Sequence, residues 1–188
     1  MAMVPMVDAV PGTVASSAEY NKIIDNVEDL NTRTLALEAA GTPTGLPFLH
    51  VYQAVGSSVP NNTLTALTWD TELSDTHNWH ATNAATYVPQ LAGRYRCVGM
   101  VSLAGGLTGP FMAQFLKNGS IYAGARYNTE HAVNQGFLAN TVITEATIIC
   151  NGTTDTISLG CQHNFGSTQT TFVGTGVASY MIIEYKGT

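Results

Sequence analysis

The sequence predicts a mainly β protein, in which an antiparallel sandwich follows a short helical stretch. The region 48–188 is poor in charged residues, rich in Thr, Gly and Asn, and lacks an apolar period of helical length. Its apolar residues alternate in short runs, which turn signals such as Asn118-Gly119 and Asn151-Gly152 separate. About eight or nine such runs in one compact region are typical of two packed sheets, as in a sandwich or jelly roll.

The first predicted element is an extended arm over residues 1–15. It carries Pro5, Pro11 and Gly12 among Val, Met and Ala, without a helical or alternating period. It also lacks the basic start of a secretory signal peptide. No run of the sequence approaches the roughly 20 apolar residues that cross a bilayer, so we expect no membrane insertion.

Residues 16–41 are predicted to form a helix, with Ser16 or Ser17 as the N-cap and Gly41 as the stop. Its stripe of side chains at spacings of three and four is narrow, which favours a coiled-coil seam. A lone helix of this length is marginal, and the stiff linker 42–47 separates it from the β region. We expect the seam to pack against identical helices, with packing on its own domain as the alternative. The seam comprises Tyr20, Ile23, Val27, Leu30, Thr34 and Leu37.

Nine strands are expected within the head region 48–188. The clearest alternation lies in residues 156–163, where Ile157, Leu159 and Cys161 share one face and polar residues occupy the other. The expected strands cover residues 48–54, 63–69, 86–89, 94–104, 111–117, 120–127, 139–150, 156–164 and 178–186.

Two of these strands are apolar on both faces. Since a two-sheet sandwich has one interior, a second apolar face indicates a contact with other subunits, and a covering loop is the alternative. On this argument four side chains of the head are assigned to the subunit contact: Phe111, Phe115, Tyr180 and Ile182.

Four stretches resemble, in order, the jelly-roll head of complement component one subcomponent q and tumour necrosis factor relatives. They are Pro60–Asp70, Asn78–His80, Tyr87–Arg96 and Phe115–Gly119. The head is more specifically similar to virion proteins of tailed bacteriophages that carry such a domain. The leader Ala18–Asn31 resembles the short helices that precede heads in phage tail and fibre proteins.

The resemblance implies a homotrimeric structural component of a phage virion, made in the cytoplasm of the host bacterium. It would be a fibre or receptor-binding tail protein, whose arm docks onto other virion proteins and whose head attaches to a glycan or protein of the host surface. A capsid-decorating head fibre is one alternative. A secreted trimeric receptor ligand of the tumour necrosis factor type is another, which the missing signal peptide disfavours.

Loops of the head are the expected contact with the host surface, because binding residues gather on loops and these are rich in aromatic and hydrogen-bonding side chains. The candidate binding residues are Asp75, His77, Asn78, His80, Tyr127 and His131.

The same region offers weak candidates for a calcium site in Asp70, Glu72 and Asp75. Calcium takes six or more oxygen ligands, and a loop without glycine among these acids is poorly suited to supply them. We therefore expect no bound metal or cofactor, with calcium as the one cation that the resemblance keeps open.

Composition and motifs exclude further classes of function. A net charge of -6 argues against binding to nucleic acid. No nucleophile elbow, zinc-protease helix, phosphate loop or dinucleotide fingerprint occurs, so we expect a protein that is not an enzyme.

The three cysteines are expected to be buried free thiols. If residues 151–155 form a hairpin turn, Cys150 and Cys161 lie too far apart for a disulfide, which needs Cα atoms within roughly 7 Å. Free thiols suit assembly in a reducing cytoplasm.

Overall fold

The computed structural model describes residues 21, 22, 25–30, 32, 45–104, 109–131, 139–174 and 178–188, with the backbone alone at 124–131 and 139. The chain divides into two units, residues 1–44 and 45–188. In the first unit the described residues are helical, and Thr32 Oγ1 donates a hydrogen bond to the carbonyl of Glu28 over 2.8 Å. Two positions of the predicted seam, Val27 and Leu30, are exposed there. Four positions of the predicted seam lie outside the described residues: Tyr20, Ile23, Thr34 and Leu37.

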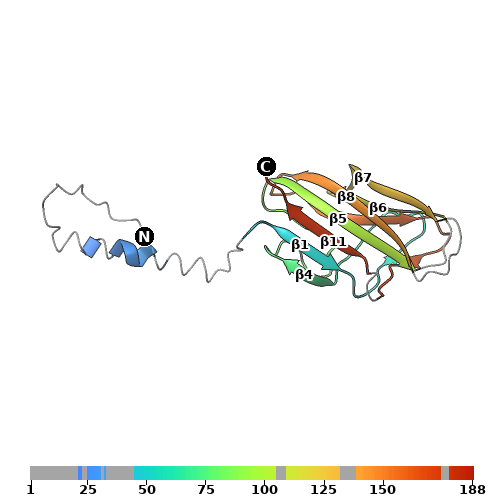
Figure 1. Ribbon diagram of the computed structural model, residues 1–188, viewed down its shortest axis with the longest axis horizontal. Coiled ribbons are helices and arrows are strands. Elements are labelled where there is room, and N and C mark those ends of the chain that lie inside the picture. The colour runs from blue at the N-terminus through green and yellow to red at the C-terminus, as the bar shows by residue number, and fades with distance from the viewer. Residues whose placement is uncertain are drawn as a thin grey trace. The chain divides into compact units, whose positions relative to one another are not determined.

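The second unit is an antiparallel β domain, which confirms the predicted fold class (Figure 1). Its strands, in chain order, are β1 Phe48–Tyr52, β2 Ser58–Val59, β3 Thr65–Ala66, β4 Thr71–Asp75, β5 Gly93–Ala104, β6 Gly109–Lys117, β7 Ser120–His131, β8 Ala139–Cys150, β9 Ile157–His163, β10 Gln169–Thr170 and β11 Tyr180–Tyr185.

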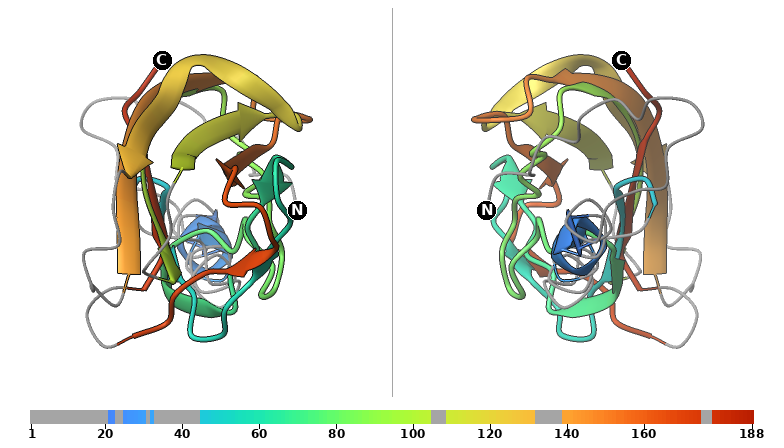
Figure 2. Two further views of the ribbon diagram at one scale, coloured as in Figure 1. Left: turned by 90° about the vertical axis from the view of Figure 1, so that its right-hand side faces the viewer. Right: turned by 90° about the vertical axis from the view of Figure 1, so that its left-hand side faces the viewer.

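Two main sheets make up this domain. One has the order β4-β1-β11-β5-β8 and the other β3-β9-β6-β7, while β10 and β2 form a small additional pair. Seen along the domain, the strands of the two sheets lie around a common interior, and β7 of the second sheet lies beside β8 of the first (Figure 2). Non-consecutive neighbours such as β1 and β11 make the topology that of a jelly roll and not of a simple meander.

The core lies between the two sheets, because each sheet turns one apolar face inward. In β5 the buried side chains Tyr95, Cys97, Val101 and Leu103 alternate with more exposed ones along most of the strand. Gly99 occupies the same inward face, where a Cβ would lie 2.6 Å from a methyl carbon of Leu159 in β9. The missing side chain therefore lets the opposite sheet pack closely at this point.

The predicted strands agree best with the structure where alternation is long. Strand β8 has the predicted bounds, whereas the predicted strand 63–69 shortens to β3 and the predicted strand 86–89 reduces to bridges at Tyr87. The segment 71–75 was expected to be a loop and is instead the edge strand β4, paired with β1. The sequence of this segment does not predict a strand, because its side chains do not alternate between apolar and polar. An edge strand with exposed Glu72 and Leu73 does not require such alternation.

The assignment of Phe111 and Phe115 to a subunit contact was wrong. Both side chains are fully buried in the core of their own domain, so no surface of theirs remains for a neighbour. The opposite face of β6 is covered by the chain itself at one end: Leu116 is buried, and it lies with Leu64 over the space that a side chain at Gly160 would fill. The covering-loop alternative therefore holds at Leu116, whereas Met112 on the same face stays partly exposed.

The prediction of three buried free thiols is confirmed for Cys97, Cys150 and Cys161. Burial raises the pKa of the Cys150 thiol to about 11 and that of Cys161 to about 12. The expected hairpin between their strands was wrong, because β8 and β9 belong to different sheets. The thiols are therefore unreactive core side chains in the domain.

Candidate functional site

The outward face of the five-stranded sheet is the first candidate site. Tyr52, Tyr180, Met100 and Ile143 stand side by side across four strands in one row of the register. Ile143 is 53% exposed, and the other three are partly exposed. The row is therefore an apolar strip open to solvent in the single chain.

A second row continues this strip. It consists of His50, Ile182, Val98 and Glu145, again on neighbouring strands. His50 meets Tyr180 edge to face, with 6.2 Å between the ring centroids. We call the seven neutral residues of the two rows the apolar sheet face: Tyr52, Tyr180, Met100, Ile143, His50, Ile182 and Val98.

A charged band borders the apolar sheet face. Arg96 Nε donates to Glu145 Oε1 over 2.7 Å, and its Nη1 reaches Glu184 Oε2 at 3.5 Å. Lys186 Nζ lies 2.8 Å from the same Glu184 oxygen. The hydrogen bond from Lys186 is the main cause that holds the pKa of Glu184 below its usual range, outweighing partial desolvation. An apolar centre beside paired charges is the usual composition of a protein interface.

The prediction that strand 180–185 has a second apolar face is thus supported by the side-chain directions. Tyr180 and Ile182 point outward, while Met181 and Ile183 are fully buried in the core. The outer side chains Tyr180 and Ile182 of this strand stay partly exposed. They therefore lie outside the core between the two sheets.

The loop residues predicted to bind a host surface differ in their exposure and contacts. His77 and Asn78 are on the surface: His77 is partly exposed and packs edge to face on Trp79, with ring centroids 4.8 Å apart, and Asn78 is exposed with a left-handed φ of 54°. Asp75 is engaged locally, accepting hydrogen bonds from the backbone amides of His77 and His80.

The assignment of His80 to a binding surface was wrong. Its side chain is buried, with Nδ1 2.7 Å from Glu72 Oε1 and Nε2 3.2 Å from the carbonyl oxygen of Ala84. Through these two contacts His80 links β4 to the turn that follows it. Tyr127 was expected where the strand 120–127 ends and a loop begins, and His131 was expected in that loop. Both belong to β7, opposite Ala113 and Gly109, and their side chains lie outside the described part of the structure.

The three weak calcium candidates do not converge. Asp70 accepts hydrogen bonds from the amides of Ala54 and Val55, while Glu72 faces His80 and Asp75 caps the 76–80 turn. Within the described residues no group of three His, Cys, Asp or Glu side chains is placed to hold a metal ion. Each carboxylate serves a separate contact of the fold.

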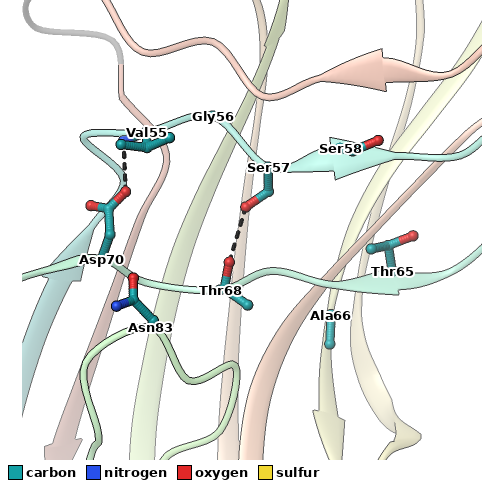
Figure 3. A pocket seen from close by; sticks show the side chains of 9 residues that line it. All are labelled: Val55, Gly56, Ser57, Ser58, Thr65, Ala66, Thr68, Asp70 and Asn83. Atoms are coloured by element: carbon teal, nitrogen blue, oxygen red, sulfur yellow. Dashed lines mark hydrogen bonds between the residues drawn. The ribbon is translucent and has the colours of Figure 1, made fainter.

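A pocket of about 470 Å³ lies beside Asp70. The sequence alone did not indicate it. It forms where the loop after β1, the segment around β3 and the turn at Asn83 meet (Figure 3). Ser57 and Thr68 face one another in it, with 3.2 Å between their hydroxyl oxygens. No short motif could have signalled it, because its lining comes from three separate stretches of the chain.

Comparison with known proteins is informative only for the fold. No protein-family model and no curated protein matches the sequence.

Among the helices of the described residues, none is long and apolar enough to span a membrane.

Two kinds of solved structure resemble the chain. The globular domain of zebrafish complement 1qA protein matches with a TM-score of 0.52 and 14% identity, over 74% of this chain and 95% of that one. Murine APRIL, a tumour necrosis factor relative, matches with a TM-score of 0.52 and 11% identity, over 74% of this chain and 99% of that one. The β domain therefore has the jelly-roll fold of the complement and tumour necrosis factor domains.

Proposed function

We propose that this chain is a structural, self-associating protein: a homotrimer whose jelly-roll heads form the tip of a fibre or tail protein on a phage particle and attach it to the host surface. The observation that carries the proposal is the apolar sheet face. Soluble single chains rarely expose a contiguous apolar area across four neighbouring strands unless another molecule covers it.

A second copy of the same chain is the occupant that the charges favour. Arg96, Glu145, Glu184 and Lys186 border the apolar sheet face with both signs in one band, so that two copies can meet without an excess of like charge. The exposed Val27 and Leu30 of the helical segment add a second point of association. The fold and the sequence resemblance support three as the number of copies.

The role on a virion rests on the resemblance of the leader and the head to phage fibre and tail proteins. The buried free thiols are compatible with assembly in a reducing bacterial cytoplasm. The proposed work is binding and not catalysis, with the arm of residues 1–15 docking to other virion proteins.

Two measurements test the proposal. Sedimentation equilibrium of the full chain should give three times the 19.9 kDa of one copy, and a stable single chain at micromolar concentration would overturn the trimer. Gold-labelled antibody against the purified protein should then decorate one fixed place on phage particles in electron micrographs. A trimer that labels no particle would refute the virion role while leaving self-association intact.

A further inference from the structure

An open pocket beside Asp70 is large enough to hold a small molecule. Its volume of about 470 Å³ lies within the roughly 300 to 1,000 Å³ that is usual for such sites. Its lining carries hydroxyl, amide and carboxylate groups and no Lys or Arg. The residues are Val55, Gly56, Ser57, Ser58, Thr65, Ala66, Thr68, Asp70 and Asn83.

Asp70 supplies a fixed acceptor at one end of the pocket. Its Oδ1 accepts from the amide of Ala54 at 2.7 Å and the hydroxyl of Thr71 at 2.8 Å, and its Oδ2 accepts from the amide of Val55 at 2.6 Å. A carboxylate has about four acceptor positions, so these three hydrogen bonds leave room for a ligand hydroxyl to donate to Asp70. Desolvation opposes the charge of Asp70, but these hydrogen bonds outweigh it and hold its pKa below the usual value.

Ser57 and Thr68 supply a donor. The buried Gln53 donates both hydrogens of its Nε2, one to Ser57 Oγ at 2.7 Å and one to the carbonyl oxygen of Thr68 at 2.9 Å. The two hydroxyls then share one hydrogen bond of 3.2 Å between themselves. Whichever of them donates in that bond, one hydroxyl hydrogen is left over, and it can be donated to a ligand.

Asn83 supplies a group that both donates and accepts, next to Asp70 (Figure 3). Its backbone is held in the left-handed region at a φ of 66°, with its amide donating to the carbonyl of Trp69 at 2.7 Å. The side-chain amide makes no hydrogen bond within the described residues. Val55, which is 69% exposed, adds an apolar surface at the pocket edge.

We propose that this pocket binds a neutral saccharide unit, through neighbouring hydroxyl groups that donate to Asp70 and accept from Asn83 and from the Ser57–Thr68 pair. Sugar hydroxyls both donate and accept, and a C–H face of the ring can rest on Val55. A lone carboxylate in a chain of net charge -6 repels anionic ligands. The inference rests on the proposed attachment role and gives that role a partner class.

The test uses the full chain and saturation-transfer difference NMR. The probes are the methyl glycosides of glucose, galactose, mannose and N-acetylglucosamine, with N-acetylneuraminic acid as the anionic probe. At least one neutral glycoside should receive magnetisation from the protein and the anionic sugar should receive none. Absence of transfer to all four neutral probes, or equal transfer to the anionic one, would overturn the proposal.

Variants locate the binding. Asn83→Gly keeps the left-handed backbone and removes the amide, so affinity should fall about fivefold to tenfold, as the loss of one hydrogen bond gives. Thr68→Val, nearly the same shape, should also weaken binding. Asn62→Gly is the matched control, because Asn62 is also exposed with a left-handed φ and does not line the pocket. Unchanged affinity in both pocket variants would place binding elsewhere, and the sedimentation mass of the same samples keeps this result separate from the trimer.

Discussion

Replacing Ile182 with Asp should dissociate the proposed trimer without unfolding the head. Ile182 lies at the centre of the apolar sheet face and is already partly buried in the single chain, so a subunit contact adds about 1 kcal/mol of apolar burial per copy. An unpaired carboxylate in the same interface costs about 3 kcal/mol more. Three copies give about 12 kcal/mol, or roughly nine powers of ten in the association constant.

Sedimentation velocity at micromolar concentration measures the outcome, with circular dichroism as the check that the head stays folded. Ile121→Asp is the matched control, since Ile121 is 54% exposed on β7, in the other sheet, and its substitution should leave the mass unchanged. A folded Ile182→Asp protein that keeps the mass of three copies would refute the assignment of the interface to this face.

Two further results are expected. Burial lowers the pKa of His50, so the unfolded chain binds a proton more readily than the folded chain does. The free energy of unfolding should therefore decrease as the pH falls through about 6.5. The groups that face His50 are Tyr180, Ile182, Ser74 and, further along the row, Glu145. Urea midpoints at about pH 7.5 and 5.5 should differ less in His50→Gln than in the natural chain, and an equal difference would show that other groups dominate. Gly99→Ala should lower the free energy of unfolding by about 1 to 3 kcal/mol, because its Cβ would lie 2.6 Å from Leu159. Leu159→Ala in the same chain should recover part of that loss. If the losses of the two single variants simply add in the double variant, as measured in denaturant melts, the contact is contradicted.

The prediction of the strands succeeded where burial follows a period of two. Strand β8 shows this best, because its residues alternate between core and surface from Val142 to Cys150. Strand β4 was missed, since an edge strand pairs through its backbone and its side chains are under little demand for alternation.

Face assignment was harder where both sides of a strand are apolar. In β6 the alternation separates Phe111 and Phe115 from Met112 and Leu116 but does not say which set meets the core. Only the packing of Leu64 and Leu116 over Gly160 shows that the chain covers that strand itself. In β11 the same pattern leaves Tyr180 and Ile182 partly exposed.

The candidate sites differ in the same way. The outward position of Tyr180 and Ile182 followed from local alternation, whereas the burial of His80 depends on contacts with Glu72 and Ala84 that no spacing rule predicts. The pocket joins residues 55–58, 65–70 and 83, which meet only after β1, β3 and the following turn are folded.

The amino-acid pattern was enough to predict the fold class, the free thiols and which residues of a regular strand share a face, because side-chain periodicity is a local property of the backbone. Which apolar faces stay open and which polar groups converge became visible only in the folded domain. Both depend on what distant segments cover, and coverage is set by packing between strands far apart in the chain.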